Sequence, residues 1–149
     1  MTKDVVITIR GLQFMEGDSD DEIETLQRGQ YYEKNGSRFL LFDEYMEGFT
    51  EPAKNVMRFK DHEMTLTKRG LINVQLDFET GKKNLTSYTT PFGVIMLGVD
   101  TKNITVEEKE DELTLKIDYI LEADYQFVAD CQISVCARSV GNRQEAVNE

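Results

Sequence analysis

Glu44 and Arg69 are the side chains with the clearest potential for chemistry in this 149-residue sequence. Leu40, Phe42 and Met46 stand at alternate positions around Glu44, so a regular strand would point this carboxylate towards a core. A buried carboxylate is costly unless it is paired. The sequence therefore predicts that Glu44 is either a general base or ligand anchor, or a structural carboxylate that pairs with an arginine or caps a neighbouring strand.

Arg69 is the predicted partner of Glu44. It stands between Thr67 and Gly70 at a predicted strand end, where a guanidinium can bind both oxygens of a carboxylate. Such an arginine either holds the anionic group of a ligand or closes one mouth of a barrel. Tyr88 and Tyr119 would add hydroxyl contacts, or place their rings in the core and their hydroxyls at its edge. The predicted ligand-binding residues are Glu44, Arg69, Tyr88 and Tyr119.

Other chemistries lack the residues they need. His62 is the only histidine, and the acidic residues on both sides of it favour a surface position. Cys131 and Cys136 lie on opposite faces of a predicted strand, about 16 Å apart at ~3.3 Å per residue, which is beyond disulfide reach. With one histidine and this spacing, a structural zinc site lacks its four ligands. We therefore expect reduced thiols, no metal and no cofactor.

The acidic run at residues 18–22 and the catalytic signatures were also considered. An EF-hand starting at Asp18 would need Gly at its sixth position and Glu at its twelfth, where the sequence has Ile23 and Gly29. A solvated acidic turn or a loosely bound surface cation fits this run. No Gly-x-Ser-x-Gly or phosphate-binding loop is present, so the sequence favours a protein that is not an enzyme.

Period-two alternation of apolar and polar residues dominates the chain and predicts strands. The clearest runs cover residues 113–123, 127–137 and 72–78, with shorter ones at 5–9, 39–46 and 64–66. Residues 51–59 fit a short helix beginning at Pro52 or a strand, and we favour the strand. Short turns between the runs predict an antiparallel, meandering β-barrel of roughly eight to ten strands. We expect one domain over residues 1–138 and a polar tail over 139–149.

The charge balance narrows the partners. Lys and Arg total 17 against 28 Asp and Glu, which gives a net charge of −11 and disfavours nucleic acid and anionic membranes. The N-terminus lacks the ~7 to 15 apolar residues of a signal peptide, and no run reaches the ~18 to 20 of a membrane span. We therefore expect a cytoplasmic protein.

Four short motifs, taken in order, carry a family resemblance. They are Leu-Phe-Asp-Glu at 41–44, Thr-Lys-Arg-Gly at 67–70, Tyr-Thr-Thr-Pro-Phe-Gly at 88–93 and Leu-Lys-Ile-Asp-Tyr-Ile-Leu at 115–121. From about Val5 to Ala137 the chain resembles the YwiB-like family, small cytoplasmic bacterial proteins of unknown function. The resemblance implies a lipocalin-like (calycin) β-barrel and brings no established activity or site residues.

These observations leave several functional hypotheses. The first is a cytoplasmic barrel that binds a small, partly apolar, carboxylate-bearing ligand in its interior. The second is a filled barrel that serves as a protein-interaction module, with a protein partner or a second copy. The third is an enzyme using a cluster of Glu44, Arg69 and Tyr88. Interior volume distinguishes them, because no ligand site survives if the large predicted inward residues fill the barrel: Phe42, Phe78, Leu115, Tyr119 and Phe127.

Overall fold

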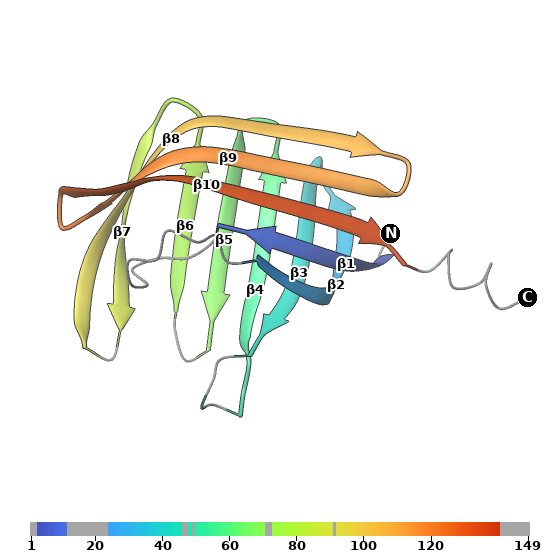
Figure 1. The fold of residues 1–149 in the computed structure, drawn as a ribbon, viewed down its shortest axis with the longest axis horizontal. Helices are drawn as coiled ribbons and strands as arrows, with labels where there is room; N and C mark the ends of the chain where they lie inside the picture. Colours follow the sequence, from blue (N-terminus) through green and yellow to red (C-terminus); the bar gives the residue numbers. More distant parts are fainter. Residues whose placement is uncertain are drawn as a thin grey trace, which may run out of the picture.

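The computed structural model describes residues 3–11, 24–45, 48, 50–70, 73–90 and 92–140. These residues form ten strands (Figure 1). None of them forms a helix long and apolar enough to span a membrane. The strands are β1 (Lys3–Arg10), β2 (Glu24–Lys34), β3 (Ser37–Glu44), β4 (Ala53–Lys60), β5 (Glu63–Arg69), β6 (Val74–Glu79), β7 (Lys83–Thr90), β8 (Gly93–Lys109), β9 (Glu112–Ala123) and β10 (Gln126–Ser139).

All ten strands belong to one antiparallel sheet, in the order β6-β5-β4-β3-β2-β1-β10-β9-β8-β7. The sheet curls so that its edge strands, β6 and β7, face each other across a seam (Figure 1). Asn84 of β7 spans the seam, donating through Nδ2 to the Asp77 carbonyl at 3.1 Å and to Glu79 Oε1 at 3.2 Å. The predicted all-β, antiparallel, meandering barrel is confirmed, and the barrel is nearly closed.

Alternating burial follows the sequence pattern closely. Along β9 the odd-numbered residues from Leu113 to Leu121 are buried, and those between them are not. The region that also fitted a helix is strand β4, in which Ala53, Asn55, Met57 and Phe59 are all buried. A sheet with one packed face gives this period of two. The apolar face of each strand therefore faces the interior.

Gly29 marks a bend in β2 that matters for the site. Residues 24–31 of β2 pair with β1, but pairing with β3 begins only at Gly29, opposite Phe42. A Cβ added at Gly29 would come within 2.5 Å of the Leu41 carbonyl oxygen and 2.6 Å of Ile7 Cδ1. Only glycine fits this close approach. Beyond it, residues 24–28 run on without pairing to β3.

Large side chains fill the barrel interior. Phe78 of β6 and Tyr119 of β9 meet edge to face with ring centroids 5.1 Å apart. The predicted inward positions of Phe42, Phe78, Leu115 and Tyr119 are confirmed. The predicted inward position of Phe127 is wrong, because its side chain is 64% exposed. The register shifts between residues 127 and 129, and this shift interrupts the alternation of β10. The largest fully buried side chains are Tyr119, Phe59, Phe78, Ile7, Leu40, Met57, Met64, Leu66, Leu76, Leu97, Leu115 and Ile117.

Candidate functional site

Polar side chains gather inside the barrel at both of its ends, above and below the apolar filling. We use the name Glu44 end for the end that holds Glu44, Asn55 and Lys68. There β3 and β5 finish and β4 begins. The opposite end, where β2 and β8 finish and β3 begins, holds Tyr31, Glu33, Arg38 and Glu108, and we name it the Arg38 end.

At the Glu44 end, the carboxylate is the centre of a small hydrogen-bonded group. Lys68 Nζ donates to Glu44 Oε1 at 2.7 Å, and Asn55 Nδ2 donates to the same oxygen at 3.3 Å. The side chain of Lys68 is only 12% exposed. The expectation that Glu44 shares a face with Leu40 and Phe42 is correct, since both are buried in the interior. A carboxylate on this inward face is costly unless it is paired, and Glu44 is paired with a cation.

That cation is Lys68, so the predicted pairing of Glu44 with Arg69 is wrong. Met64 and Leu66 of β5 are buried, and the period of two places Lys68 on their face and Arg69 on the other. Arg69 is exposed and stands opposite Lys54 of β4. Counting by two from Met64 would have identified Lys68 from the sequence.

A small cavity lies against this group. Its volume is about 50 Å³. Asn55 is 1% exposed, and its Oδ1 atom has no hydrogen-bond partner although Nδ2 has two. Nothing in the sequence distinguished this asparagine, which occupies an apolar position of the alternation in β4. The residues lining the cavity are Ile9, Thr25, Gln27, Phe42, Glu44, Asn55 and Lys68.

An open cleft of about 760 Å³ lies on the other side of the same wall, over the diverging parts of β2, β3 and β4. Gln27, Phe42 and Asn55 line both the cleft and the cavity. The exposed apolar side chains Leu26 and Tyr45 border the cleft. The bend at residue 29 thus separates β2 from β3 next to the unpartnered amide oxygen.

The two predicted tyrosines lie elsewhere. Tyr119 is 2% exposed, and burial raises its pKa well above the ordinary value. Its hydroxyl has no hydrogen-bond partner. Tyr88 of β7 is half-buried and packs against the core. Neither lines the cavity at the Glu44 end. Since Arg69 also faces outward, Glu44 alone of the four predicted residues stands at this cavity.

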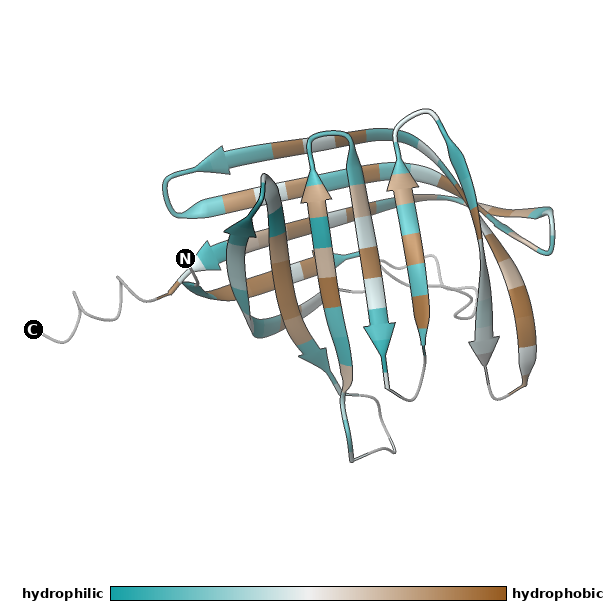
Figure 2. Ribbon diagram, turned by 180° about the vertical axis from the view of Figure 1, so that it is seen from behind, coloured by the Kyte–Doolittle hydropathy of each residue, from teal (hydrophilic) through white to brown (hydrophobic). Residues whose placement is uncertain are grey.

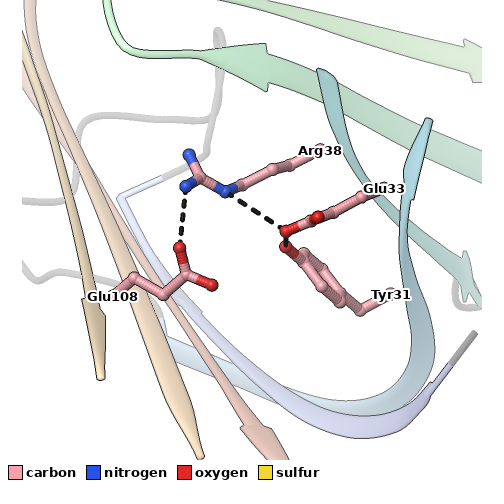
Figure 3. Close-up of polar contacts among 4 residues, drawn as sticks. All are labelled: Tyr31, Glu33, Arg38 and Glu108. Atoms are coloured by element: carbon pink, nitrogen blue, oxygen red, sulfur yellow. Dashed lines mark hydrogen bonds and ion pairs between the residues drawn. The ribbon is translucent and has the colours of Figure 1, made fainter. Parts of the chain in front are cut away.

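The Arg38 end is closed by an ion pair between strands far apart in the sheet (Figure 3). Arg38 Nη2 of β3 donates to Glu108 Oε1 of β8 at 2.7 Å. Arg38 Nε is buried and lies 4.0 Å from Glu33 Oε2, an ion-pair distance but too long for a hydrogen bond. Tyr31 Oη donates to the same Glu33 oxygen at 2.8 Å. The four side chains form one connected group.

The electrostatics of the Arg38 end favour its present charge state. Burial disfavours the charged guanidinium, but the attraction of Glu108 and Tyr31 and the hydrogen bonding with them together outweigh it and raise the pKa of Arg38. Burial, with the hydrogen bond to Glu33, raises the pKa of Tyr31 above its ordinary value. The inward position of Arg38 could have been predicted from the sequence, since it lies two residues before Leu40 on the same face of β3, but its pairing with Glu108 could not.

The structure also describes the two cysteines and the single histidine. Both cysteines are free, as predicted: Cys131 packs against the core, and Cys136 Sγ donates to Glu112 Oε2 at 3.1 Å. His62 is exposed in the turn between β4 and β5. Within the described part of the chain, no group of three or more His, Cys, Asp or Glu could hold a metal ion. The acidic run at 18–22 and the tail beyond residue 140 lie outside the described residues.

The fold and its two polar ends define a small β-barrel with a packed interior. A family model described as "Domain of unknown function (DUF1934)" matches residues 7–135, and the chain belongs to this family. It is 26% identical over 120 residues to the "Uncharacterized beta-barrel protein YwiB" of Bacillus subtilis (strain 168), covering 80% of this chain and 83% of that protein. The crystal structure of the ywiB protein matches the fold with a TM-score of 0.76 and 18% identity, over 93% and 92% of the two chains.

Proposed function

We propose that this protein binds a small, partly apolar molecule at the Glu44 end, and that the bound head group is a hydrogen-bond donor, an amine or a hydroxyl. The head group occupies the cavity beside Asn55, and the apolar part lies along Phe42 and in the outer cleft. A cytoplasmic location and a lipocalin-like relationship stay predictions from the sequence.

The observation that carries this proposal is the unpartnered Oδ1 atom of Asn55. Burying an amide oxygen without a donor costs about 1–3 kcal/mol, so such an atom can gain a hydrogen bond from a bound molecule or an ordered water. The orientation of the amide is set by its own contacts, because Nδ2 faces two acceptors, Glu44 Oε1 and the Ala53 carbonyl. Oδ1 is therefore the atom whose acceptor capacity is unused, in a residue that lines the cavity.

The charges around the cavity select the same head group. Lys68 already donates to Glu44, and the other Glu44 oxygen is a further acceptor. The chain as a whole carries a net charge of −11, which attracts cations and repels carboxylates. The carboxylate-bearing ligand expected from the sequence depended on Arg69, which faces outward. An ammonium or hydroxyl group matches the acceptors that are present.

Size limits how the ligand can lie. Small-molecule sites usually have volumes of about 300–1,000 Å³, whereas the cavity at the Glu44 end has about 50 Å³. A head group with one or two carbons fits there, and a longer tail must extend into the cleft of about 760 Å³. A ligand in the middle of the barrel, the position first expected, would have to displace Phe59, Phe78 or Tyr119.

Calorimetric titration with n-butylamine, n-butanol and n-butyrate tests the proposal, because the probes share a tail and differ in the head group. We expect n-butylamine to bind at least about tenfold more tightly than n-butyrate, a difference of ~1.4 kcal/mol. The alcohol separates hydrogen bonding from charge. In Asn55→Leu, which keeps the volume and removes the acceptor, binding of the amine and the alcohol should be lost.

Arg69→Ala is the matched control. Because Arg69 faces outward next to Lys68, this variant should bind n-butylamine as the wild type does. Thermal unfolding of each variant shows whether it is folded. Equal binding of butyrate and butylamine, or unchanged amine binding by a folded Asn55→Leu, would overturn the proposal. An absence of binding by all three probes, with only an ordered water on Asn55, would overturn it as well.

A further inference from the structure

The outer cleft at the Glu44 end contains a cation that the amine or hydroxyl head group does not use. Among the residues described along this cleft, Arg28 of β2 and Lys54 of β4 are the cations and Asp43 of β3 is the carboxylate. Lys54 Nζ lies 3.5 Å from Asp43 Oδ1, so these two side chains form an ion pair. Arg28 is exposed and makes no hydrogen bond or ion pair within the described part of the chain. The cleft therefore holds one guanidinium whose donors are unused.

This guanidinium borders an apolar surface. The exposed side chains of Leu26 and Tyr45 line the same cleft, and the middle of β3 is hydrophobic (Figure 2). Although the chain has 28 Asp and Glu against 17 Lys and Arg, none of the carboxylates that the structure describes pairs with Arg28. A guanidinium presents two parallel N–H donors that match the two oxygens of a carboxylate. The cleft thus combines apolar surface with a group that binds carboxylates.

Strand β2 connects this cleft with the inner cavity. Gln27 lines both spaces, and Arg28, the next residue, stands on the other face of the strand because successive side chains alternate. Phe42 and Asn55 also line both spaces. A molecule whose head group contacts Asn55 and whose tail passes Phe42 therefore emerges in the cleft that Arg28 lines.

We propose that the ligand is an ω-amino carboxylate, with its amine beside Asn55, its methylene chain along Phe42 and its carboxylate on Arg28. This inference rests on the proposed function and adds the group at the far end of the ligand. The two cations and one carboxylate described along the cleft leave one positive charge, which matches a carboxylate better than a doubly charged phosphate. An ω-amino carboxylate has no net charge, so the net charge of −11 on the chain does not repel it.

Calorimetric titration with matched pairs of probes tests this inference. In each pair a carboxylate replaces the terminal methyl group of an alkylamine with the same number of methylene groups: γ-aminobutyrate with n-butylamine, ε-aminocaproate with n-hexylamine, and ω-aminocaprylate with n-octylamine. Comparing the lengths identifies the spacer that joins the two groups. We expect at least one amino carboxylate to bind at least about fivefold more tightly than its matched amine, which is the gain expected from an exposed ion pair.

Arg28→Gln removes the charge from the cleft. In this variant each amino carboxylate should bind no more tightly than its matched amine, and the amines should bind as they do to the wild type. Arg58→Gln is the matched control, because Arg58 is also exposed and unpaired within the described residues but is not among those described along the cleft. It should keep the advantage of the carboxylate. Higher salt should reduce this advantage in the wild type, since it screens an exposed ion pair.

The outcomes separate this inference from the proposed function. If the amines bind but no carboxylate improves binding, or if Arg28→Gln keeps the improvement, the inference is wrong and the proposed function stands. Equal losses in Arg28→Gln and Arg58→Gln would also overturn it, because the effect would then come from the general charge of the outer face. If neither the amines nor the amino carboxylates bind, both proposals fail.

Discussion

Both ends of the barrel hold charged and polar side chains, but the two ends differ in which strands their ion pairs join and in which buried atoms lack hydrogen bonds. At the Arg38 end, a guanidinium joins β3 to β8, strands that are far apart in the sheet. At the Glu44 end, the pair of Glu44 and Lys68 joins β3 to β5, which are separated by β4 alone. The first pair spans the mouth of the barrel, and the second stays on one side of it.

The buried atoms without hydrogen bonds differ in the same way. At the Arg38 end the atom is a donor, Arg38 Nε, and Glu33 lies 4.0 Å away as its electrostatic partner. At the Glu44 end it is an acceptor, Asn55 Oδ1, next to a cavity. The first atom has an ion-pair partner within the chain, whereas the second has no hydrogen-bond partner and belongs to a residue that lines the cavity. This difference supports the proposal that the Glu44 end binds a ligand, while the ion pair at the Arg38 end stabilises the barrel.

Among the substitutions that test this comparison, the largest expected effect is at the Arg38 end. Arg38→Met should lower the free energy of unfolding by about 2 kcal/mol, because it leaves Glu33 and Glu108 without their cation. Chemical denaturation measures this, with Arg58→Met, at an exposed position of the neighbouring strand β4, as the control. A loss no greater than that of the control would show that the pair does not close the barrel.

Lys68→Met should cost less, about 1 kcal/mol. The carboxylate it leaves is partly exposed and keeps its bond from Asn55, and the pair does not span the mouth. The same denaturation experiment with Arg69→Met, one residue along on the outer face, gives the background value. If Lys68→Met cost as much as Arg38→Met or more, the assignment of stability to the Arg38 end would be wrong.

Much of this arrangement could be predicted from the sequence, and the rest depends on which strands the fold brings together. The alternation of apolar and polar residues predicted the strands and the inward positions of Phe78, Leu115 and Tyr119. The same counting would have placed Lys68 inward and Arg69 outward, but preference for an arginine partner selected the wrong residue. Arg38 and Glu108 are on strands without a common ladder, so no local pattern could pair them.

The position of Phe127 and the role of Asn55 were also beyond the sequence. A register shift between residues 127 and 129 depends on how β10 fits β9, and alternation alone does not reveal such an irregularity. An asparagine at an apolar position reads as an interruption of the pattern. Its unpartnered oxygen depends on where Glu44 and the Ala53 carbonyl lie, and this is a property of the folded chain.

Alkaline pH should affect the Arg38 end through Tyr31. The pKa of Tyr31 is raised in the folded state, so its contribution to stability is present below about pH 10, the ordinary value. This contribution is lost as the pH rises through and beyond that value. Tyr31→Phe should therefore make the decline in stability above about pH 10 shallower. In the Tyr31→Phe variant, ultraviolet titration should show one fewer tyrosine with a raised pKa. Loss of a tyrosine with an ordinary pKa instead would contradict this.

The smallest expected effect concerns the outer surface near the Arg38 end. The hydrogen bond from the Cys136 thiol, helped by Arg138, lowers the pKa of Glu112. Glu112 thus contributes stability above its unfolded pKa, which is lost as the pH falls through the folded value. In Cys136→Ala the pKa of Glu112, followed by NMR, should rise towards its ordinary value. Cys131→Ala is the control and should leave it unchanged.

The most direct test of the division between the two ends is one NMR titration that observes both. The Asn55 side-chain amide reports on the Glu44 end and the Arg38 Nε–H on the Arg38 end. We predict that n-butylamine shifts the Asn55 signals in a saturable manner while the Arg38 signal stays in place, and that n-butyrate shifts neither. If butylamine shifted Arg38 and not Asn55, or butyrate shifted Asn55 as strongly as butylamine, the account would be contradicted.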